Sequence, residues 1–265
     1  MDSVGIVVPH DMALDRELWR WAPDDVTLLL TRTPYSPLAV TTELVEDLGD
    51  PVMIARAATD LVAVEPLAYG YGCTSGSFIY GVAGERAITE AVTTATGRPA
   101  VTTSGAMVAA AAELGLRRVA VADPYEQRLS DAFVRYLAET GTEVVGEECL
   151  GLTHEIWRVD PDTVWRLLLA ADRPDADGLL VACTNMPSYD LLSRVEAVIG
   201  KPVITANQAT MWALLRLVGR QPVGPGQRLV SATAGPRQAA EQGAGPVTGR
   251  VTGRGAGPGL VGSVS

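Results

Sequence analysis

The chain has 265 residues, of which 47% are hydrophobic, so it can bury the core of one large α/β domain or of two modest lobes. Its formal net charge of −10 argues against a nucleic-acid partner, and its short, interrupted apolar stretches argue against a membrane span. The N-terminal MDSVGIVVPH lacks the basic and apolar regions of a signal peptide, and three cysteines are too few for a disulfide framework. We therefore expect a cytoplasmic protein with reduced thiols.

Short β-branched runs alternate with stretches of helical spacing along the whole chain. The predicted strands are residues 4–8, 26–30, 67–72, 99–103, 118–122, 143–146, 178–182 and 202–205. The predicted helices are residues 53–64, 82–96, 105–115, 126–140, 161–171, 188–199 and 207–218, with Asp160 as a candidate N-cap before Pro161. This alternation predicts parallel sheets with helices on both faces.

One sequence unit occurs twice. GRPAVTTSGAM at 97–107 corresponds to GKPVITANQATM at 200–211, and a strand ending in Cys-Thr precedes each copy, at Cys73-Thr74 and at Cys183-Thr184. The duplication predicts an α/β fold of two pseudo-symmetric, Rossmann-like (flavodoxin-like) lobes with parallel sheets. The ligand site is then expected in the cleft between the lobes.

The boundaries of the lobes follow from the same pattern. Residues 1–112 plus 206–221 are assigned to the first lobe and residues 113–205 to the second. From about Gln221 the composition shifts to Gly, Pro, Ala, Val and Ser without a sustained apolar period, so residues 222–265 are predicted to be a disordered tail.

Few residues of this sequence suit a cofactor. Lys201 is the single lysine and lies between Gly200 and Pro202, just ahead of a strand, which argues against a pyridoxal phosphate Schiff base. His10 and His154 have no metal-ligand neighbour at suitable spacing, and no phosphate-binding glycine motif follows a strand. We therefore expect no cofactor and chemistry that depends on thiols, hydroxyls, carboxylates and backbone dipoles.

Cys73 and Cys183 occupy equivalent places in the repeat, at strand ends where open parallel sheets bind ligands. The helix start expected after each cysteine would favour the thiolate, the form that a nucleophile or a carbon-acid base requires. The alternative, that a free cysteine is a small buried hydrophobic residue, is preferred for Cys149 only. Donors that could hold a substrate carboxylate and stabilise an enolate follow both thiols: Thr74, Ser75, Ser77, Thr184 and Asn185.

The CTSGSF segment at 73–78 and the CTNMPSYD segment at 183–190 resemble the maleate cis–trans isomerase and arylmalonate decarboxylase group of the aspartate/glutamate racemase superfamily. The resemblance covers about residues 3–218. In that group each lobe supplies one catalytic position; the isomerases have cysteine at both, whereas the decarboxylase has glycine at the first. The resemblance therefore implies an isomerase or a racemase.

For this chain the resemblance implies a cofactor-independent isomerase of a small carboxylic acid. Cys73 would attack a double bond to give a succinyl-type adduct, and Cys183 would be its proton donor. An amino-acid-type racemase, like relatives in ectoine utilisation, remains open, with the two thiols acting on opposite faces of one carbon. An arylmalonate-type decarboxylase and a non-catalytic two-lobed ligand-binding protein also remain open. A homo-oligomer is compatible with the sequence.

Three further positions compare with the group less closely. Tyr125 follows a strand, as does the tyrosine that binds a substrate carboxylate in the group; the alternative is an ordinary aromatic residue at a helix start. Asp11 takes the place of a carboxylate-binding asparagine. An ionised aspartate would repel a substrate carboxylate by about 1 to 4 kcal/mol and would suit an ammonium or amide group, unless Asp11 is a helix N-cap. His154 is expected in a surface loop.

Overall fold

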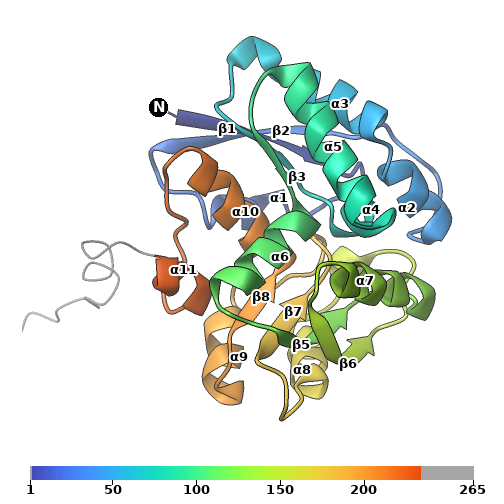
Figure 1. Cartoon of the computed structure of the whole chain (residues 1–265), viewed down its shortest axis with the longest axis vertical. Helices are drawn as coiled ribbons and strands as arrows, with labels where there is room; N and C mark the ends of the chain where they lie inside the picture. The colour runs from blue at the N-terminus through green and yellow to red at the C-terminus, as the bar shows by residue number, and fades with distance from the viewer. Residues whose placement is uncertain (1, 234–265) are drawn as a thin grey trace, which may run out of the picture.

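The computed structural model describes residues 2–233 (Figure 1). Two four-stranded sheets contain all eight predicted strands, and every pairing between neighbours is parallel. The first sheet has the order β2-β1-β3-β4, with strands β1 (Asp2–Val8), β2 (Val26–Arg32), β3 (Tyr69–Tyr71) and β4 (Ala100–Thr102). The second has the order β6-β5-β7-β8, with strands β5 (Arg118–Asp123), β6 (Glu143–Cys149), β7 (Gly178–Val181) and β8 (Val203–Thr205). The identical order confirms the predicted duplication and the α/β fold class.

The central strands are apolar on both faces because helices cover both sides of each sheet. Val119, Ala120, Val121 and Ala122 of β5 are fully buried, as are Ile6, Val7 and Val8 of β1. This explains why β5 has a continuous apolar run in the sequence rather than an alternating one.

The predicted helices are present with shifted ends. They are α3 (Pro51–Thr59) with a following 3-10 turn (Val62–Val64), α5 (Gly81–Thr96), α6 (Thr103–Glu113), α7 (Gln127–Glu139), α8 (Pro161–Ala171), α9 (Leu192–Ile199) and α10 (Ala206–Leu217). Asp160 caps α8 as predicted, since its side chain accepts a hydrogen bond from the Thr163 N–H at 2.9 Å. The helix predicted from residue 188 begins only at Leu192, because residues 184–191, which include Pro187, form turns.

Helices α6 and α10 lie between the two sheets (Figure 1). Although α10 follows β8 of the second sheet, it packs against β3 and β4 of the first sheet and beside α6. The Thr103 and Thr210 hydroxyls are 2.7 Å apart and join the two helices. The chain thus returns to its first half after completing the second.

Helix α4 (Thr74–Phe78) begins directly after Cys73, as expected. The sequence did not predict three other short helices: α1 (Asp15–Trp19), α2 (Thr42–Leu48) and α11 (Arg228–Thr233). Helix α11 corrects the prediction that disorder begins at residue 222. Leu229 and Val230 are buried, and the Gln227 side-chain oxygen accepts hydrogen bonds from Trp21 Nε1 and Gln208 Nε2, both at 2.9 Å. These contacts are tertiary, so a Gly- and Pro-rich composition gives little sign of them. Residues 234–265 of the predicted tail lie outside the described residues.

Across residues 2–233, the structure contains no helix that is both long and apolar enough to cross a bilayer.

Candidate functional site

One cavity brings the two halves of the chain together at the carboxyl ends of their strands. Its volume of about 30 Å³ has room for one or two water molecules. Eight of the site residues expected from the sequence line it, namely Asp11, Cys73, Thr74, Ser75, Tyr125, Cys183, Thr184 and Asn185. Ser77, also expected there, does not line it, and its hydroxyl lies 2.7 Å from Cys73 O. The wall is completed by Pro9 and by four apolar residues that the sequence did not indicate, Val40, Leu44, Leu48 and Ile156.

Cys73 is the N-cap residue of α4, directly after β3. Its sulfur accepts a hydrogen bond from the Gly76 N–H at 3.3 Å and lies 3.9 Å from the Ser75 hydroxyl. A Cβ at position 76 would lie 2.7 Å from both the Leu48 carbonyl oxygen and the Tyr71 hydroxyl, so only glycine fits there. Tyr71, which the sequence did not indicate, donates its hydroxyl proton to Leu48 O at 2.5 Å, and its side chain acts to lower the pKa of the Cys73 thiol.

Cys183 follows β7, and the prediction of a helix start directly after it is wrong, because turns occupy residues 184–191 as far as α9. The backbone φ of Cys183 is +83°, in the left-handed region that side-chain-bearing residues rarely adopt. The Cys183 N–H donates to Thr74 Oγ1 at 3.2 Å, so the second Cys-Thr motif touches the first. The nearby Asn185 N–H and Tyr125 side chain act to lower the pKa of the Cys183 thiol.

The pKa values of both thiols are raised, whereas thiolates were expected from the sequence. Burial raises the pKa of Cys73 to about 11 and that of Cys183 to about 12, against the opposing effect of the nearby donors. The negative charge of Asp11 raises the pKa of both thiols further. Desolvation of the sulfurs therefore outweighs the stabilisation of the thiolate that we expected from the helix start after Cys73, because α4 has only five residues.

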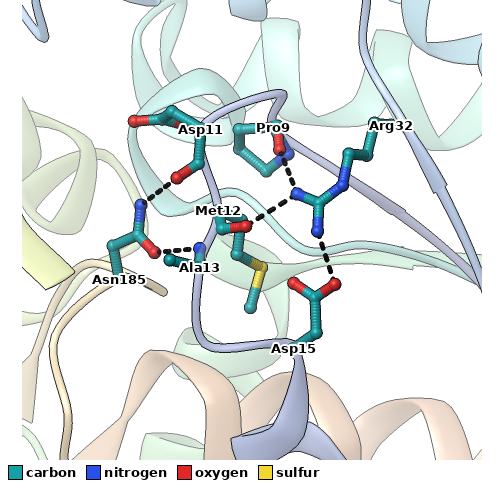
Figure 2. Close-up of polar contacts among 7 residues, drawn as sticks. All are labelled: Pro9, Asp11, Met12, Ala13, Asp15, Arg32 and Asn185. Carbon is teal, nitrogen blue, oxygen red and sulfur yellow. Dashed lines mark hydrogen bonds and ion pairs between the residues drawn. The ribbon is translucent and has the colours of Figure 1, made fainter.

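Asp11 lies on the loop after β1, and its neighbours hold that loop from both sides (Figure 2). Asn185 Nδ2 donates to Asp11 O at 3.1 Å, and Asn185 Oδ1 accepts from the Ala13 N–H at 2.8 Å. On the other side, the Arg32 guanidinium donates to Pro9 O at 3.2 Å and to Met12 O at 2.7 Å. The side-chain amide of Asn185, expected to bind substrate, is therefore engaged with the backbone of this loop.

Asp11 is not a helix N-cap, because α1 begins at Asp15 and Leu14 occupies its capping position. Burial raises the pKa of the Asp11 carboxyl, although the charges of His10 and Arg32 oppose this effect. The carboxyl group thus faces a cavity shared with two protonated thiols, and a bound ligand can change its protonation state.

Tyr125 is buried against Cys183, in the turn that follows β5. Asp123 holds this turn, since its carboxylate accepts the Tyr125 N–H at 2.9 Å and a hydrogen bond from the Ser130 hydroxyl. Burial raises the pKa of Asp123 to about 7. The Asp123-Pro124 dipeptide before Tyr125 predicts a turn from the sequence. The burial of the Asp123 carboxyl group, in contrast, depends on tertiary packing.

The remaining candidates lie apart from the cavity. His154 is exposed, as expected, and its ring Nδ1 is 3.0 Å from the Thr153 hydroxyl. Cys149 is half-buried, and its sulfur lies 3.5 Å from Gln127 Oε1. Within the part of the chain that the structure describes, no cluster of three or more His, Cys, Asp or Glu side chains could hold a metal ion.

Comparisons with known proteins match this architecture. The arylmalonate decarboxylase family model matches residues 53–230. Arylmalonate decarboxylase of Bordetella bronchiseptica is 36% identical over 150 residues, which are 55% of this chain and 62% of that enzyme. A maleate isomerase of Pseudomonas putida is 30% identical over 179 residues, which are 64% of this chain and 72% of the isomerase. The aligned part thus spans less than two thirds of the decarboxylase.

Solved structures extend the likeness over most of the chain. A liganded arylmalonate decarboxylase variant, in which cysteine replaces a glycine and serine replaces a cysteine, has a TM-score of 0.80 and 29% identity, covering 87% of this chain and 99% of that one. A maleate isomerase from Pseudomonas putida has a TM-score of 0.79 and 28% identity, covering 86% of this chain and 98% of that one. These relatives are enzymes. By fold, by sequence and by the residues matched, the chain belongs to the arylmalonate decarboxylase family.

Proposed function

We propose that this protein is a cofactor-independent cis–trans isomerase of a small unsaturated carboxylic acid, a maleate-type diacid. The observation that carries the proposal is that Cys73 and Cys183, one from each half of the chain, line the same cavity. The presence of maleate isomerases among the relatives supports it, including a cysteine-to-alanine variant from Pseudomonas putida determined with maleate, with 27% identity and a TM-score of 0.80.

The two thiols account for the chemistry as nucleophile and acid. Deprotonated Cys73 adds to one alkene carbon, and the displaced π electrons take a proton from the Cys183 thiol at the neighbouring carbon. The former double bond is now a single bond and can rotate. Cys183 then removes the proton again, the carbon–sulfur bond breaks, and the trans alkene leaves with the Cys73 thiolate restored.

The polar wall of the cavity supplies donors for the carboxylates. Thr74, Ser75 and Tyr125 carry hydroxyl groups there, and Thr184 adds another from the second half. Donors held in place before the reaction stabilise the negative charge that develops on the adduct, and a single such donor can contribute about 3 kcal/mol.

A substrate needs more room than the cavity offers. A four-carbon diacid is larger than its volume of about 30 Å³. Val40 and Ile156 line the cavity from the two halves, and the Val40 N–H donates to Thr153 O at 2.7 Å. We expect the lining to move apart when a substrate binds.

Proton NMR in deuterium oxide tests the proposal with maleate and related diacids. We expect conversion to the trans acid by the native protein and a loss of at least about a thousandfold in turnover for Cys73→Ser or Cys183→Ser, since the hydroxyl is a far weaker nucleophile and acid. Full turnover by both variants would show that the thiols are not the reacting groups. Release of carbon dioxide from an arylmalonate, without isomerisation, would favour a decarboxylase.

The position of Asp11 favours a second candidate, a racemase of an amino-acid-type substrate. Its carboxyl group faces the cavity and interacts electrostatically with both thiols. An ammonium group on the substrate would offset the cost of burying this carboxylate, by about 1 to 4 kcal/mol. The Asp11→Asn variant separates the two candidates, since it would weaken a racemase and retain or improve an isomerase of diacids. Deuterium incorporation at a stereocentre would identify the racemase directly.

A further inference from the structure

The two reacting cysteines differ in how the chain holds them. Cys73 has an extended backbone with φ −141°, and helix α4 fixes the residues that follow it. Cys183 has φ +83°, and turns rather than a helix follow it as far as α9. A strained backbone persists only where its surroundings determine it, so the segment after Cys183 needs a support other than a helix.

Glu17 of α1 provides that support from the other half of the chain. Its side chain is buried, and Oε1 accepts hydrogen bonds from the Ser188 and Tyr189 N–H groups, both at 2.7 Å. Oε2 accepts a hydrogen bond from Asn207 Nδ2 at 2.6 Å. Three donors therefore satisfy one buried carboxylate.

Asn207 extends this support to the residue next to Cys183. Its Nδ2 also donates to Thr184 O at 3.0 Å. The Glu17 carboxylate thus holds the far end of the turn directly, at Ser188, and the near end, at Thr184, through Asn207. Arg20, one helical turn after Glu17, pairs with Asp190 at 2.6 Å and fastens α1 to the same segment.

Glu17 does not line the cavity, so it touches neither the thiols nor a ligand there. A buried carboxylate is costly unless donors satisfy it, and here each donor belongs to the Cys183 segment or to the residue that holds that segment. Its contacts therefore serve the geometry of Cys183 rather than the chemistry itself.

We propose that Glu17 is a positioning residue that fixes the strained backbone of Cys183 and so directs its thiol into the shared cavity. The proposal rests on the proposed function, in which Cys183 delivers and removes the proton. We therefore expect loss of the Glu17 carboxylate to change the position and accessibility of the Cys183 thiol and to leave those of the Cys73 thiol unchanged.

Glu17→Gln tests this with little change in volume. The amide keeps an oxygen for the two backbone N–H groups but turns an NH₂ group toward the NH₂ group of Asn207. Because two donors then face each other, Asn207 can no longer serve both Glu17 and Thr184 O. We expect the Cys183 segment to loosen and its thiol to become more accessible.

The measurement is the rate of iodoacetamide labelling at pH 9, followed by mass spectrometry of the peptides that contain Cys73 and Cys183. We expect Cys183 to be labelled at least about tenfold faster in Glu17→Gln, as loss of a charged hydrogen bond permits, while Cys73 stays within about twofold. In the isomerase assay, kcat falls and KM stays close to its native value.

Glu196→Gln is the matched control. Glu196 is an equally buried glutamate whose carboxylate accepts two backbone N–H groups, from Val203 at 3.0 Å and from Arg228 at 2.9 Å, and it does not touch the Cys183 segment. This variant is expected to lose stability while Cys183 keeps its native labelling rate.

A native labelling rate for Cys183 in Glu17→Gln overturns the proposal, and so does equal acceleration at both cysteines. If the variant does not fold, Asn207→Ala removes the link to Thr184 O and must accelerate Cys183 selectively; an unchanged rate there overturns the proposal as well. Labelling requires no substrate. A selective change in a protein without isomerase activity therefore supports the positioning role and contradicts only the proposed function.

Discussion

The backbone N–H of Cys183 donates a hydrogen bond to the hydroxyl oxygen of Thr74, 3.2 Å away. The two residues belong to the two copies of the duplicated motif, so the copies are in direct contact at the cavity. Thr74 is buried, and its hydroxyl therefore connects the two halves where solvent does not compete.

Removal of this acceptor is expected to cost stability. Thr74→Val keeps the shape of the side chain but leaves the Cys183 N–H unpaired, which lowers the free energy of unfolding by about 1 to 3 kcal/mol. Urea denaturation measures the change. Thr94→Val at an exposed position of α5 is the control and should change stability by less than about 0.5 kcal/mol. Equal effects at the two sites would contradict the importance of this contact.

The opposite backbone conformations of the two cysteines predict opposite preferences for glycine. At position 183, with φ +83°, the glycine variant should be more stable than the alanine variant by about 1 kcal/mol. At position 73, with φ −141°, alanine should be more stable than glycine by about 0.5 to 1 kcal/mol. Four unfolding curves, for Gly and Ala at each position, check both signs. The same order at both positions would show that Cys183 is not strained.

The raised thiol pKa values predict slow labelling at neutral pH and a steep pH dependence. With pKa values of about 11 for Cys73 and about 12 for Cys183, the thiolate fraction of each rises about tenfold per pH unit between pH 7 and 10. Iodoacetamide labelling rates of the two peptides should follow this slope without reaching a plateau. A plateau near pH 8 would mean that the thiols are more acidic than their burial implies.

This behaviour changes what labelling can reveal about function. Fast labelling near neutral pH is the simplest signature of a catalytic thiol, and slow labelling would ordinarily favour an inert binding protein. Because burial keeps both sulfurs protonated, slow labelling is expected here of an enzyme as well and does not by itself favour a binding protein.

Asp123 predicts a loss of stability as the pH rises toward neutrality. Its pKa is about 7 in the folded protein, whereas the ordinary value for an aspartate is 3.8, so folding favours the protonated form. Its contribution to the free energy of unfolding is complete below about pH 4 and falls by up to about 1.4 kcal/mol per pH unit until about pH 7.

Asp123→Asn removes this titration and keeps an oxygen for the Tyr125 N–H. We expect the stability of the variant relative to the native protein to increase between pH 4 and pH 7 and to stay constant above about pH 8. Thermal unfolding of both proteins across this range is the measurement. A constant difference between them would show that Asp123 titrates at its ordinary pKa. In Glu147→Gln on β6, which removes a negative charge that raises the pKa of Asp123, the loss of stability is expected to be complete at a lower pH than in the native protein.

Local signals in the sequence were sufficient for the fold. Every predicted strand is present, because β-branched runs flanked by turn residues report strand formation directly. The repeat of the Cys-Thr units correctly indicated two equivalent sheets, and both units line one cavity. Asp11 and Tyr125, which the family resemblance suggested, line the same cavity, whereas Ser77 does not. Short helices such as α1 and α2 escaped prediction, since five to seven residues do not establish a helical period.

What the sequence by itself determined is therefore the duplicated α/β architecture and the residue types that meet in the cleft. Only the tertiary structure decided how those residues are used. Asn185 contacts a loop more than 170 positions away in the chain. The protonation of Cys73 and Cys183 depends on what excludes water from them, and the support that Glu17 gives to Cys183 comes from the other half of the molecule. Desolvation and long-range hydrogen bonds are properties of packing, and neither leaves a periodic trace in the order of the residues.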